Sequence, residues 1–364
     1  MTLKFHSLVI ADLQSETAAA LCVTFAVPPE LAPTFSFKAG QHVAVRALIA
    51  GEEVRRNYSI CSSPADGALR IAVKRAEGGC FSGWLHDHAA IGNRLDVMPP
   101  SGRFTVALDQ GAARAYLAIA AGSGITPVIS LIKTVLAQEP NSRFVLLYSN
   151  RNAKSIMFRA TLEDLKDGHL DRLTVLHTLS RERQDARLLN GRIDADKIAA
   201  VLKSAFPVAL PDLALLCGPT PLLKLARATL EAAGLPRERI KIENFAAQPG
   251  RPAAKAPSPD AQPGPLSPVL IPAATARITL HGREAVITMT EAETVIEAAI
   301  RAGLEAPYSC RGGMCCTCRA KLTEGQVAMD ANYSLEPWEL TAGFVLTCQS
   351  RPKTALIAID YDAR

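Results

Sequence analysis

The sequence of 364 residues contains no uninterrupted apolar run that could cross a membrane. Its most apolar window, YLAIAAGSGITPVISLIKTVL, is broken by two glycines and by a Thr-Pro pair, whereas a membrane helix needs about 20 consecutive apolar residues. The opening segment, MTLKFHSLVI, also lacks the long apolar core and the cleavage site of a signal peptide. We therefore expect a cytoplasmic protein that has no membrane partner.

Basic runs with interleaved aromatic side chains are absent as well. The formal charge is only +5, so the sequence does not predict nucleic acid as a partner. Residues 277–364 contain nine Lys and Arg against eleven Asp and Glu, which makes this part acidic and the remainder basic. A disulfide framework is also absent, because four of the nine cysteines are scattered and the others lie between residues 310 and 348. Such thiols suit a reducing compartment.

The most informative feature that is present is a dense cysteine motif. Cys310, Cys315 and Cys318 follow the spacing C-x4-C-x2-C, and Cys348 comes after 29 intervening residues. This is the plant-type ligand pattern of a 2Fe–2S cluster, and two glycines in the loop permit a tight turn whose N–H groups face the cluster. Structural zinc is the alternative, but zinc sites usually combine two short Cys pairs. Cys316 fits no ligand spacing, so we expect a small buried residue beside the cluster.

The chain up to about residue 108 consists of short β-rich runs separated by Gly and Pro turns, which predicts an antiparallel β-barrel. Three local motifs stand in this part: Arg56-Asn57-Tyr58-Ser59, Val73-Lys74-Arg75 and Gly78-Gly79-Cys80-Phe81-Ser82. The last motif opens a predicted helix, and the free N–H groups of a glycine-rich helix start favour a phosphate. An ordinary turn is the alternative interpretation of this glycine pair.

Residues 109–245 alternate between strand and helix patterns, which predicts a doubly wound parallel sheet. Gly122-Ser123-Gly124-Ile125-Thr126-Pro127 lies at the first strand-to-helix turn, where pyrophosphate binds in such folds, and the helix is expected over 129–136. The motif lacks the full G-x-G-x-x-G pattern. Cys217-Gly218-Pro219 ends a later strand on the same edge. Ser180-Arg181-Glu182-Arg183 follows another strand, where an arginine can bind a 2′-phosphate; a solvated charged loop is the alternative.

Residues 246–276 are rich in Pro, Ala and Gly without an apolar period, so we expect a semi-rigid linker. Beyond it, RITLHGREAVITM predicts a hairpin. The segment from Thr294 to Glu297 predicts a capping box at the start of a helix that stops at Gly303. Together with the cysteine loop, this is the α+β (β-grasp) plan of a ferredoxin. The expected domains are residues 1–108, 109–245 and 277–364.

In this order, the motifs resemble those of the ferredoxin–NADP reductase superfamily over residues 1–245 and those of plant-type ferredoxins over residues 277–364. The resemblance implies that Tyr58 stacks on the flavin ring and that Arg56 holds the FAD pyrophosphate. It also implies that the backbone around Ser59 lies near flavin N5. The further implied FAD contacts are Val73, Lys74, Arg75, Gly79, Phe81 and Ser82.

For the nicotinamide nucleotide, the same resemblance implies contacts with Thr126 near the nicotinamide ring and with Cys217 beside the site of hydride transfer. Ser59, Thr126 and Cys217 are therefore the candidate catalytic residues. Phe245 and Glu243 are expected to help cover the flavin face where nicotinamide docks. The other implied nucleotide contacts are Gly122, Gly124, Pro127, Ser180, Arg181, Arg183 and Gly218. The arginines favour NADPH over NADH.

Outside the linker, nearly the whole chain also resembles the reductase components of bacterial phenylacetyl-CoA ring epoxidases, in segments such as FVLLYSNRNAKSIMFR and VAMDANYSLEPWELTAGFVLTCQ. This resemblance implies that electrons pass from NADPH to FAD, to the 2Fe–2S cluster and then to di-iron oxygenase subunits. A hydride carries two electrons and the cluster accepts one, so a flavin is needed between them. The alternatives are a reductase for another oxygenase or for a hybrid-cluster protein and, from another class, a non-catalytic iron–sulfur redox sensor.

Overall fold

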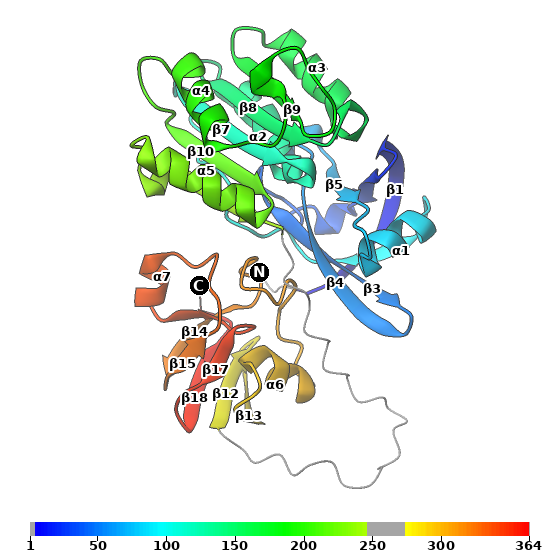
Figure 1. The fold of residues 1–364 in the computed structure, drawn as a ribbon. Coiled ribbons are helices and arrows are strands. Elements are labelled where there is room, and N and C mark those ends of the chain that lie inside the picture. The colour runs from blue at the N-terminus through cyan, green and yellow to red at the C-terminus, as the bar shows by residue number, and fades with distance from the viewer. Residues whose placement is uncertain (1–3, 246–273, 364) are drawn as a thin grey trace. The chain divides into compact units, whose positions relative to one another are not determined.

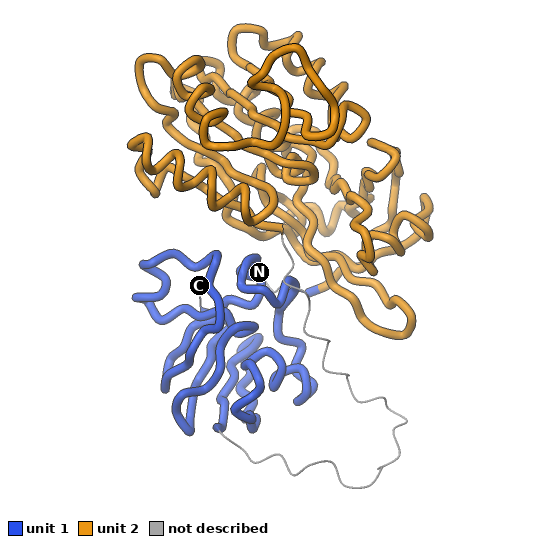
Figure 2. The backbone as a smooth tube through the Cα atoms, in the orientation of Figure 1, with its two compact units in different colours: residues 1–4, 247–364 blue, residues 5–246 orange. Residues whose placement is uncertain are grey.

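The structure, a computed structural model, describes residues 4–245 and 274–363. The chain divides into two compact units, one of residues 5–246 and one of residues 1–4 and 247–364 (Figure 2). Most of the expected linker, residues 246–273, lies outside the described residues. Its expected end is three residues too late, because a strand begins at Ala274.

The first part of the larger unit is an antiparallel sheet with the strand order β4-β3-β6-β1-β2-β5. A bridge between Ile60, just after β4, and Ile71 of β5 joins the two edge strands and confirms the predicted barrel. Helix α1 (Cys80–His88) buries Phe81 and Leu85 in the barrel core. The strands are β1 (His6–Thr17), β2 (Ala20–Ala26), β3 (His42–Ile49), β4 (Glu52–Ser59), β5 (Leu69–Lys74) and β6 (Arg94–Val97).

The second part of the larger unit is a parallel sheet with the strand order β11-β10-β7-β8-β9, as predicted. Helices α2 (Ile125–Gln138) and α3 (Arg159–Gly168) pack on one face. Helices α4 (Ala195–Ala205) and α5 (Thr220–Ala232) pack on the other face (Figure 1). The strands are β7 (Ala115–Ala121), β8 (Arg143–Asn150), β9 (Leu173–Leu179), β10 (Leu213–Gly218) and β11 (Ile240–Asn244).

Two of these helices differ from the expectation. Helix α2 begins at Ile125 rather than at residue 129, because Pro127 lies in the first turn, where backbone N–H groups have no partner within the helix. Helix α4 is absent from the predicted elements. Its local signals are nevertheless in the sequence, since Asp194 caps the helix by accepting the Lys197 N–H at 2.8 Å.

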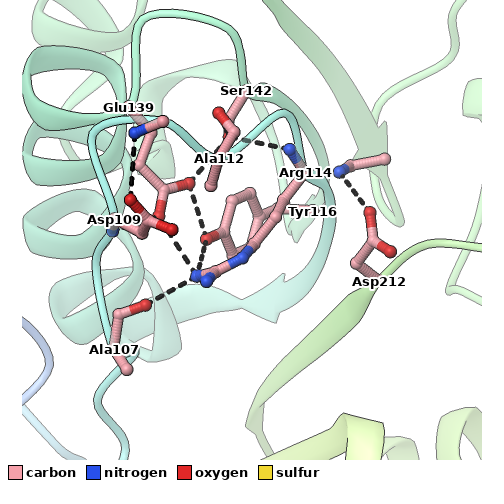
Figure 3. A network of polar contacts seen from close by, with 10 residues as sticks. Ala107, Asp109, Ala112, Arg114, Tyr116, Glu139, Ser142 and Asp212 are labelled. Carbon is pink, nitrogen blue, oxygen red and sulfur yellow. Dashed lines mark hydrogen bonds and ion pairs between the residues drawn. The ribbon is translucent and has the colours of Figure 1, made fainter.

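A buried polar network stabilises the segment between β6 and β7, which connects the two parts of the larger unit (Figure 3). The fully buried carboxylate of Glu139, just after α2, accepts hydrogen bonds from the Tyr116 hydroxyl at 2.8 Å and from the Asp109 N–H at 3.1 Å. Arg114 donates to Glu139 at 3.1 Å and to the Ala107 carbonyl at 2.6 Å. Because Ala107 and Asp109 belong to the connection between β6 and β7, this network ties that connection to α2.

The smaller unit is a mixed sheet with the strand order β13-β12-β18-β14-β16. The predicted hairpin is present as β12 and β13, which pair antiparallel, and β12 also pairs parallel with β18. Strands β15 and β17 form a separate pair. The strands are β12 (Ala274–Leu280), β13 (Arg283–Met289), β14 (Arg319–Glu324), β15 (Val327–Met329), β16 (Phe344–Leu346), β17 (Ser350–Pro352) and β18 (Leu356–Asp360).

Within residues 274–363, two helices complete the smaller unit, α6 (Val295–Arg301) and α7 (Pro337–Thr341). The predicted capping box at α6 is confirmed. The Thr294 hydroxyl accepts the Glu297 N–H at 3.4 Å, and the Glu297 carboxylate accepts the Thr294 N–H at 2.9 Å. Gly303, with φ of +76°, follows the helix as its predicted stop. Within residues 4–245 and 274–363, no helix is long and apolar enough to cross a membrane.

Candidate functional site

The four predicted ligand cysteines of the smaller unit lie together in two pairs. The thiols of Cys310 and Cys315 are within hydrogen-bond reach of each other, and those of Cys318 and Cys348 form the second pair. In the described part of the chain, no three His, Cys, Asp or Glu side chains are grouped as ligands of one metal ion. Two pairs of thiols match a cluster of two irons that takes four cysteines. The geometry therefore fits a 2Fe–2S cluster better than one zinc ion.

Hydrogen-bond donors face these thiols. The Gly312 N–H donates to the Cys310 sulfur at 3.3 Å, and the Gly313 N–H lies close to the Cys348 sulfur. Gly313 has φ of +74°, and a Cβ there would lie 2.9 Å from the Ala331 carbonyl oxygen, so the position requires glycine. The buried hydroxyl of Thr317 has no partner within the described residues. A cluster sulfur would satisfy this donor, which again fits the predicted group.

Cys316 differs from the buried residue that the sequence suggests. Its side chain is only partly buried, and its φ of +54° lies in the left-handed region that few residues other than glycine adopt. The Cys316 carbonyl accepts the Arg319 N–H at 3.1 Å. Cys316 therefore forms the turn that leads from the loop into β14, and its exclusion from the ligand set stays a prediction.

In the larger unit, β4 presents the predicted flavin motif on alternate faces. Arg56 is exposed, Tyr58 is half-buried and Ser59 is buried; Arg56 and Tyr58 lie on one face of the strand and Ser59 lies on the other. The rings of Tyr58 and Phe81 lie 5.8 Å apart between their centroids. Burial raises the pKa of the Tyr58 hydroxyl, so the side chain stays neutral.

A carboxylate links two of the predicted catalytic residues. The Ser59 hydroxyl donates to Glu243 at 3.1 Å, and Glu243 lies beside Cys217 in the β10–β11 register. Burial, followed by the charge of Glu243, raises the pKa of Cys217, so its thiol stays protonated. The other Glu243 oxygen lies 3.7 Å from Nδ1 of His42. Glu243 was expected only to help cover the flavin face, and His42 carries no sequence signal that points to this contact.

The predicted nucleotide turn lies against the Cys217 segment. Gly122–Gly124 forms a short 3-10 helix between β7 and α2. A Cβ on Gly124 would lie 2.2 Å from the Cys217 carbonyl oxygen and 3.0 Å from the Gly218 nitrogen, so only glycine fits there. Thr126 and Pro127 are buried in the first turn of α2. The Thr126 hydroxyl donates to the Ser123 carbonyl at 3.0 Å, and its role near nicotinamide stays a prediction.

The two cations predicted to contact FAD have different surroundings. Arg75 binds Asp87 through two hydrogen bonds of 2.8 and 2.9 Å. The ammonium of Lys74 lies 3.6 Å from where a Cβ on Gly122 would be, which places it beside the nucleotide turn. Burial, followed by the positive charge of Arg151, lowers the pKa of Lys74. An anion bound beside Lys74 would be stabilised by both positive charges, so Lys74 is available to the nucleotide as well as to FAD.

The predicted helix start has the expected form. A Cβ on Gly79 would lie 2.5 Å from the Ser82 hydroxyl oxygen, and that oxygen accepts the Ala76 N–H at 3.1 Å. Val73 and Phe81 are buried in the barrel core, and the Val73 carbonyl oxygen lies 3.0 Å from Nε2 of His86, so their contacts with FAD stay a prediction.

The charged loop after β9 is fixed to the end of β8. The Ser180 N–H donates to the Asn150 carbonyl at 3.0 Å, and the Arg181 N–H donates to the Arg151 carbonyl at 2.8 Å. The side chains of Arg181 and Arg183 are exposed, and the side chain of Phe245 is 38% exposed. These three side chains are therefore accessible to a ligand.

Comparisons with known proteins agree with this arrangement. Three family models match: an oxidoreductase FAD-binding domain over residues 11–106, an oxidoreductase NAD-binding domain over 118–228 and a 2Fe-2S iron-sulfur cluster binding domain over 278–353. One of the subunits of 1,2-phenylacetyl-CoA epoxidase from Escherichia coli (strain K12) is 42% identical over 99% of this chain and 98% of its own length. The chain belongs to the family of oxygenase reductase components.

Other relatives extend the comparison of this reductase. The ferredoxin reductase component of 3-ketosteroid-9-alpha-monooxygenase from Rhodococcus rhodochrous is 35% identical over 97% of this chain and 96% of its own length. The solved structure of phthalate dioxygenase reductase matches with a TM-score of 0.58 and 23% identity over 98% of each chain, which shows a common fold. The reductase thus transfers electrons from NAD(P)H to FAD and on to a 2Fe–2S cluster.

Proposed function

We propose that this reductase takes electrons from NADPH and delivers them to the di-iron oxygenase subunits of a phenylacetyl-CoA epoxidase. The observation that carries the proposal is the 42% identity to a component of such an epoxidase over nearly the full length of both chains. The ketosteroid and glycine betaine monooxygenase reductases are less similar, at 35% and 32% identity. A reductase for one of those oxygenase classes is therefore the second candidate.

We assign the cluster to Cys310, Cys315, Cys318 and Cys348, because their thiols form two adjacent pairs. Bound FAD supplies the ability to accept a hydride and to release electrons singly. Glu243 holds the Ser59 hydroxyl in place at the end of β4. Cys217 is neutral, and its carbonyl packs closely against Gly124. We infer that Cys217 positions the nucleotide turn and does not react itself.

The preference for NADPH is the part of the proposal that rests on charge. Arg181 and Arg183 extend from a loop that backbone hydrogen bonds hold at the carboxyl edge of the parallel sheet. A 2′-phosphate there would gain charge-assisted hydrogen bonds from guanidinium groups. Lys74 forms a second cationic position next to Gly122, which suits the pyrophosphate of the same nucleotide.

The deciding experiment mixes the purified reductase with purified di-iron epoxidase subunits, phenylacetyl-CoA and NADPH. We expect NADPH oxidation to be coupled to epoxide formation, and we expect no coupled turnover with a ketosteroid oxygenase. Ferricyanide reduction by NADPH is the control for the flavin half of the reaction. Ferricyanide reduction without epoxide formation would refute the proposal that the epoxidase subunits are the electron acceptor, and would leave the reductase activity itself supported. A protein that oxidised no NADPH with either acceptor would be a redox sensor.

A further inference from the structure

Gln349 follows the last cysteine of the cluster motif, and its amide points back into the cysteine loop. Its side chain is buried, and its Nε2 lies 2.8 Å from the Arg311 carbonyl oxygen and 2.9 Å from the Cys348 carbonyl oxygen. The same nitrogen lies 3.5 Å from the Cys348 sulfur; since the amide has two hydrogens, the sulfur shares one of them with the Cys348 carbonyl oxygen. One side chain therefore contacts both the beginning of the loop and the sulfur at its far end.

The surroundings of Gln349 hold the amide in this orientation. A Cβ on Gly313 would lie 3.2 Å from Cγ of Gln349, so this side chain packs directly on the glycine of the loop. The Gln349 backbone is fixed as well, since its N–H donates to the Leu346 carbonyl at 2.8 Å and its carbonyl accepts the Asp330 N–H at 2.9 Å. The donor is thus preorganised and does not need to be ordered when charge arrives at the sulfur.

A fixed donor at a ligand sulfur has a definite effect on a cluster that accepts electrons. The reduced cluster carries one more negative charge than the oxidised cluster, and an N–H group directed at a sulfur stabilises that charge. Hydrogen bonds to the sulfurs are among the factors that set the potentials of such clusters. Their effect is larger in a buried site of low dielectric constant.

We propose that Gln349 raises the reduction potential of the cluster by donating an amide hydrogen to the Cys348 sulfur, while its contact with the Arg311 carbonyl holds the loop in place. This inference rests on the proposed assignment of Cys348 as a ligand. Gln349 is a positioning and tuning residue, because it acts on the cluster through a ligand. The same contact favours electron transfer from the flavin to the cluster, because a higher potential makes the cluster the better acceptor.

The test uses the full-length reductase and measures the midpoint potential of the cluster, by a redox titration followed by the electron paramagnetic resonance signal of the reduced state. Gln349→Met keeps the length of the side chain and removes its N–H donors. We expect the ratio of reduced to oxidised cluster at a fixed potential to fall about tenfold, which corresponds to about 59 mV for one electron.

A matched control separates tuning from loosening of the loop. The Ser334 hydroxyl donates to the Gly313 carbonyl at 3.1 Å, so Ser334→Ala removes a bond that anchors the same loop and leaves the Gln349 amide in place. We expect this variant to keep the wild-type potential. An equal shift in both variants would show that loop anchoring sets the potential and would overturn the proposal. A ratio of reduced to oxidised cluster in Gln349→Met that stays within twofold of the wild-type ratio would also overturn it.

Labelling supplies a second measurement that needs no variant. In reductase labelled with 15N at the glutamine side-chain amides, the reduced cluster should show a hyperfine coupling to one such nitrogen. Absence of the coupling would overturn the proposal even if Gln349→Met failed to assemble its cluster. A wild-type protein without a cluster signal would instead refute the proposed function, so the two failures are distinguishable.

Discussion

The two units of this reductase build their sites in different ways. In the smaller unit, the predicted ligands come from one loop and one return segment between residues 310 and 348. In the larger unit, the contact between Ser59 and Glu243 joins residues 184 positions apart. A metal cluster requires a fixed ligand set at fixed spacing, and such a set leaves a local signature in the sequence. A site for a flavin and a nucleotide uses strand ends and turns, whose residues meet only when the sheets have formed.

The largest effect in this comparison should follow from removing one cluster ligand. Replacing Cys310, Cys315, Cys318 or Cys348 singly by Ser should abolish the visible absorption of the cluster while the flavin absorption remains, because a hydroxyl is a poor substitute for a thiolate ligand. Absorption spectra of the purified variants measure both cofactors. Cys316→Ser is the matched control and should keep the cluster; loss of the cluster in that variant alone would show that the assigned ligand register is wrong.

Separating the two units is the next strongest test. A chain that ends after Phe245 retains the three hydrophobic clusters of the larger unit, so it should fold, bind FAD and reduce ferricyanide with NADPH. It should not support oxygenase turnover, because the plant-type cluster, with a potential on the order of −400 mV, is the one-electron outlet. Oxygenase turnover by the shortened chain equal to that of the whole chain would show that the cluster is not on the electron path.

The flavin of the larger unit is expected to be FAD. Mass analysis of the released flavin should find FAD and not FMN.

Each unit also contains a buried glutamate that can be tested separately. Glu139 in the larger unit pairs with Arg114, and Glu339 in the smaller unit pairs with Arg319 at 2.7 Å; both carboxylates are fully buried. Replacing either glutamate by Leu leaves its partners unpaired and should cost about 3–5 kcal/mol. Urea unfolding is followed by flavin fluorescence for the larger unit and by cluster absorption for the smaller unit. Glu139→Leu should lower the urea midpoint of the flavin transition only, and Glu339→Leu should lower that of the cluster transition only. Equal loss of both signals would mean that the units do not unfold separately.

The smallest effect concerns the choice of nucleotide. Arg181→Ala should lower the preference for NADPH over NADH about tenfold, because it removes a charge-assisted hydrogen bond worth about 1.5–3 kcal/mol. The values of kcat/KM for the two nucleotides measure the preference. Arg227→Ala is a suitable control, since Arg227 pairs with Glu231 on α5. An unchanged preference for NADPH in Arg181→Ala would show that Arg181 does not bind the 2′-phosphate.

The sequence by itself determined the elements whose signals are local. The cysteine spacing, the capping box at Thr294, the glycine stop at Gly303 and the order of barrel, parallel sheet and ferredoxin plan all depend on residues close together in the chain or on a repeated pattern. These features were predicted and agree with the structure. Helix α4 also had local signals, in its Asp194 cap and apolar spacing, but was not predicted.

Only the tertiary structure decided which distant groups meet. It joined Ser59 to Glu243, placed Lys74 beside Gly122 and directed the Gln349 amide at the Cys348 sulfur. It also showed that the nucleotide turn lies against the Cys217 carbonyl, where a side chain on Gly124 would not fit. The physical reason is that such contacts depend on strand register and on the packing of helices against sheets, and neither is encoded in the spacing of neighbouring residues.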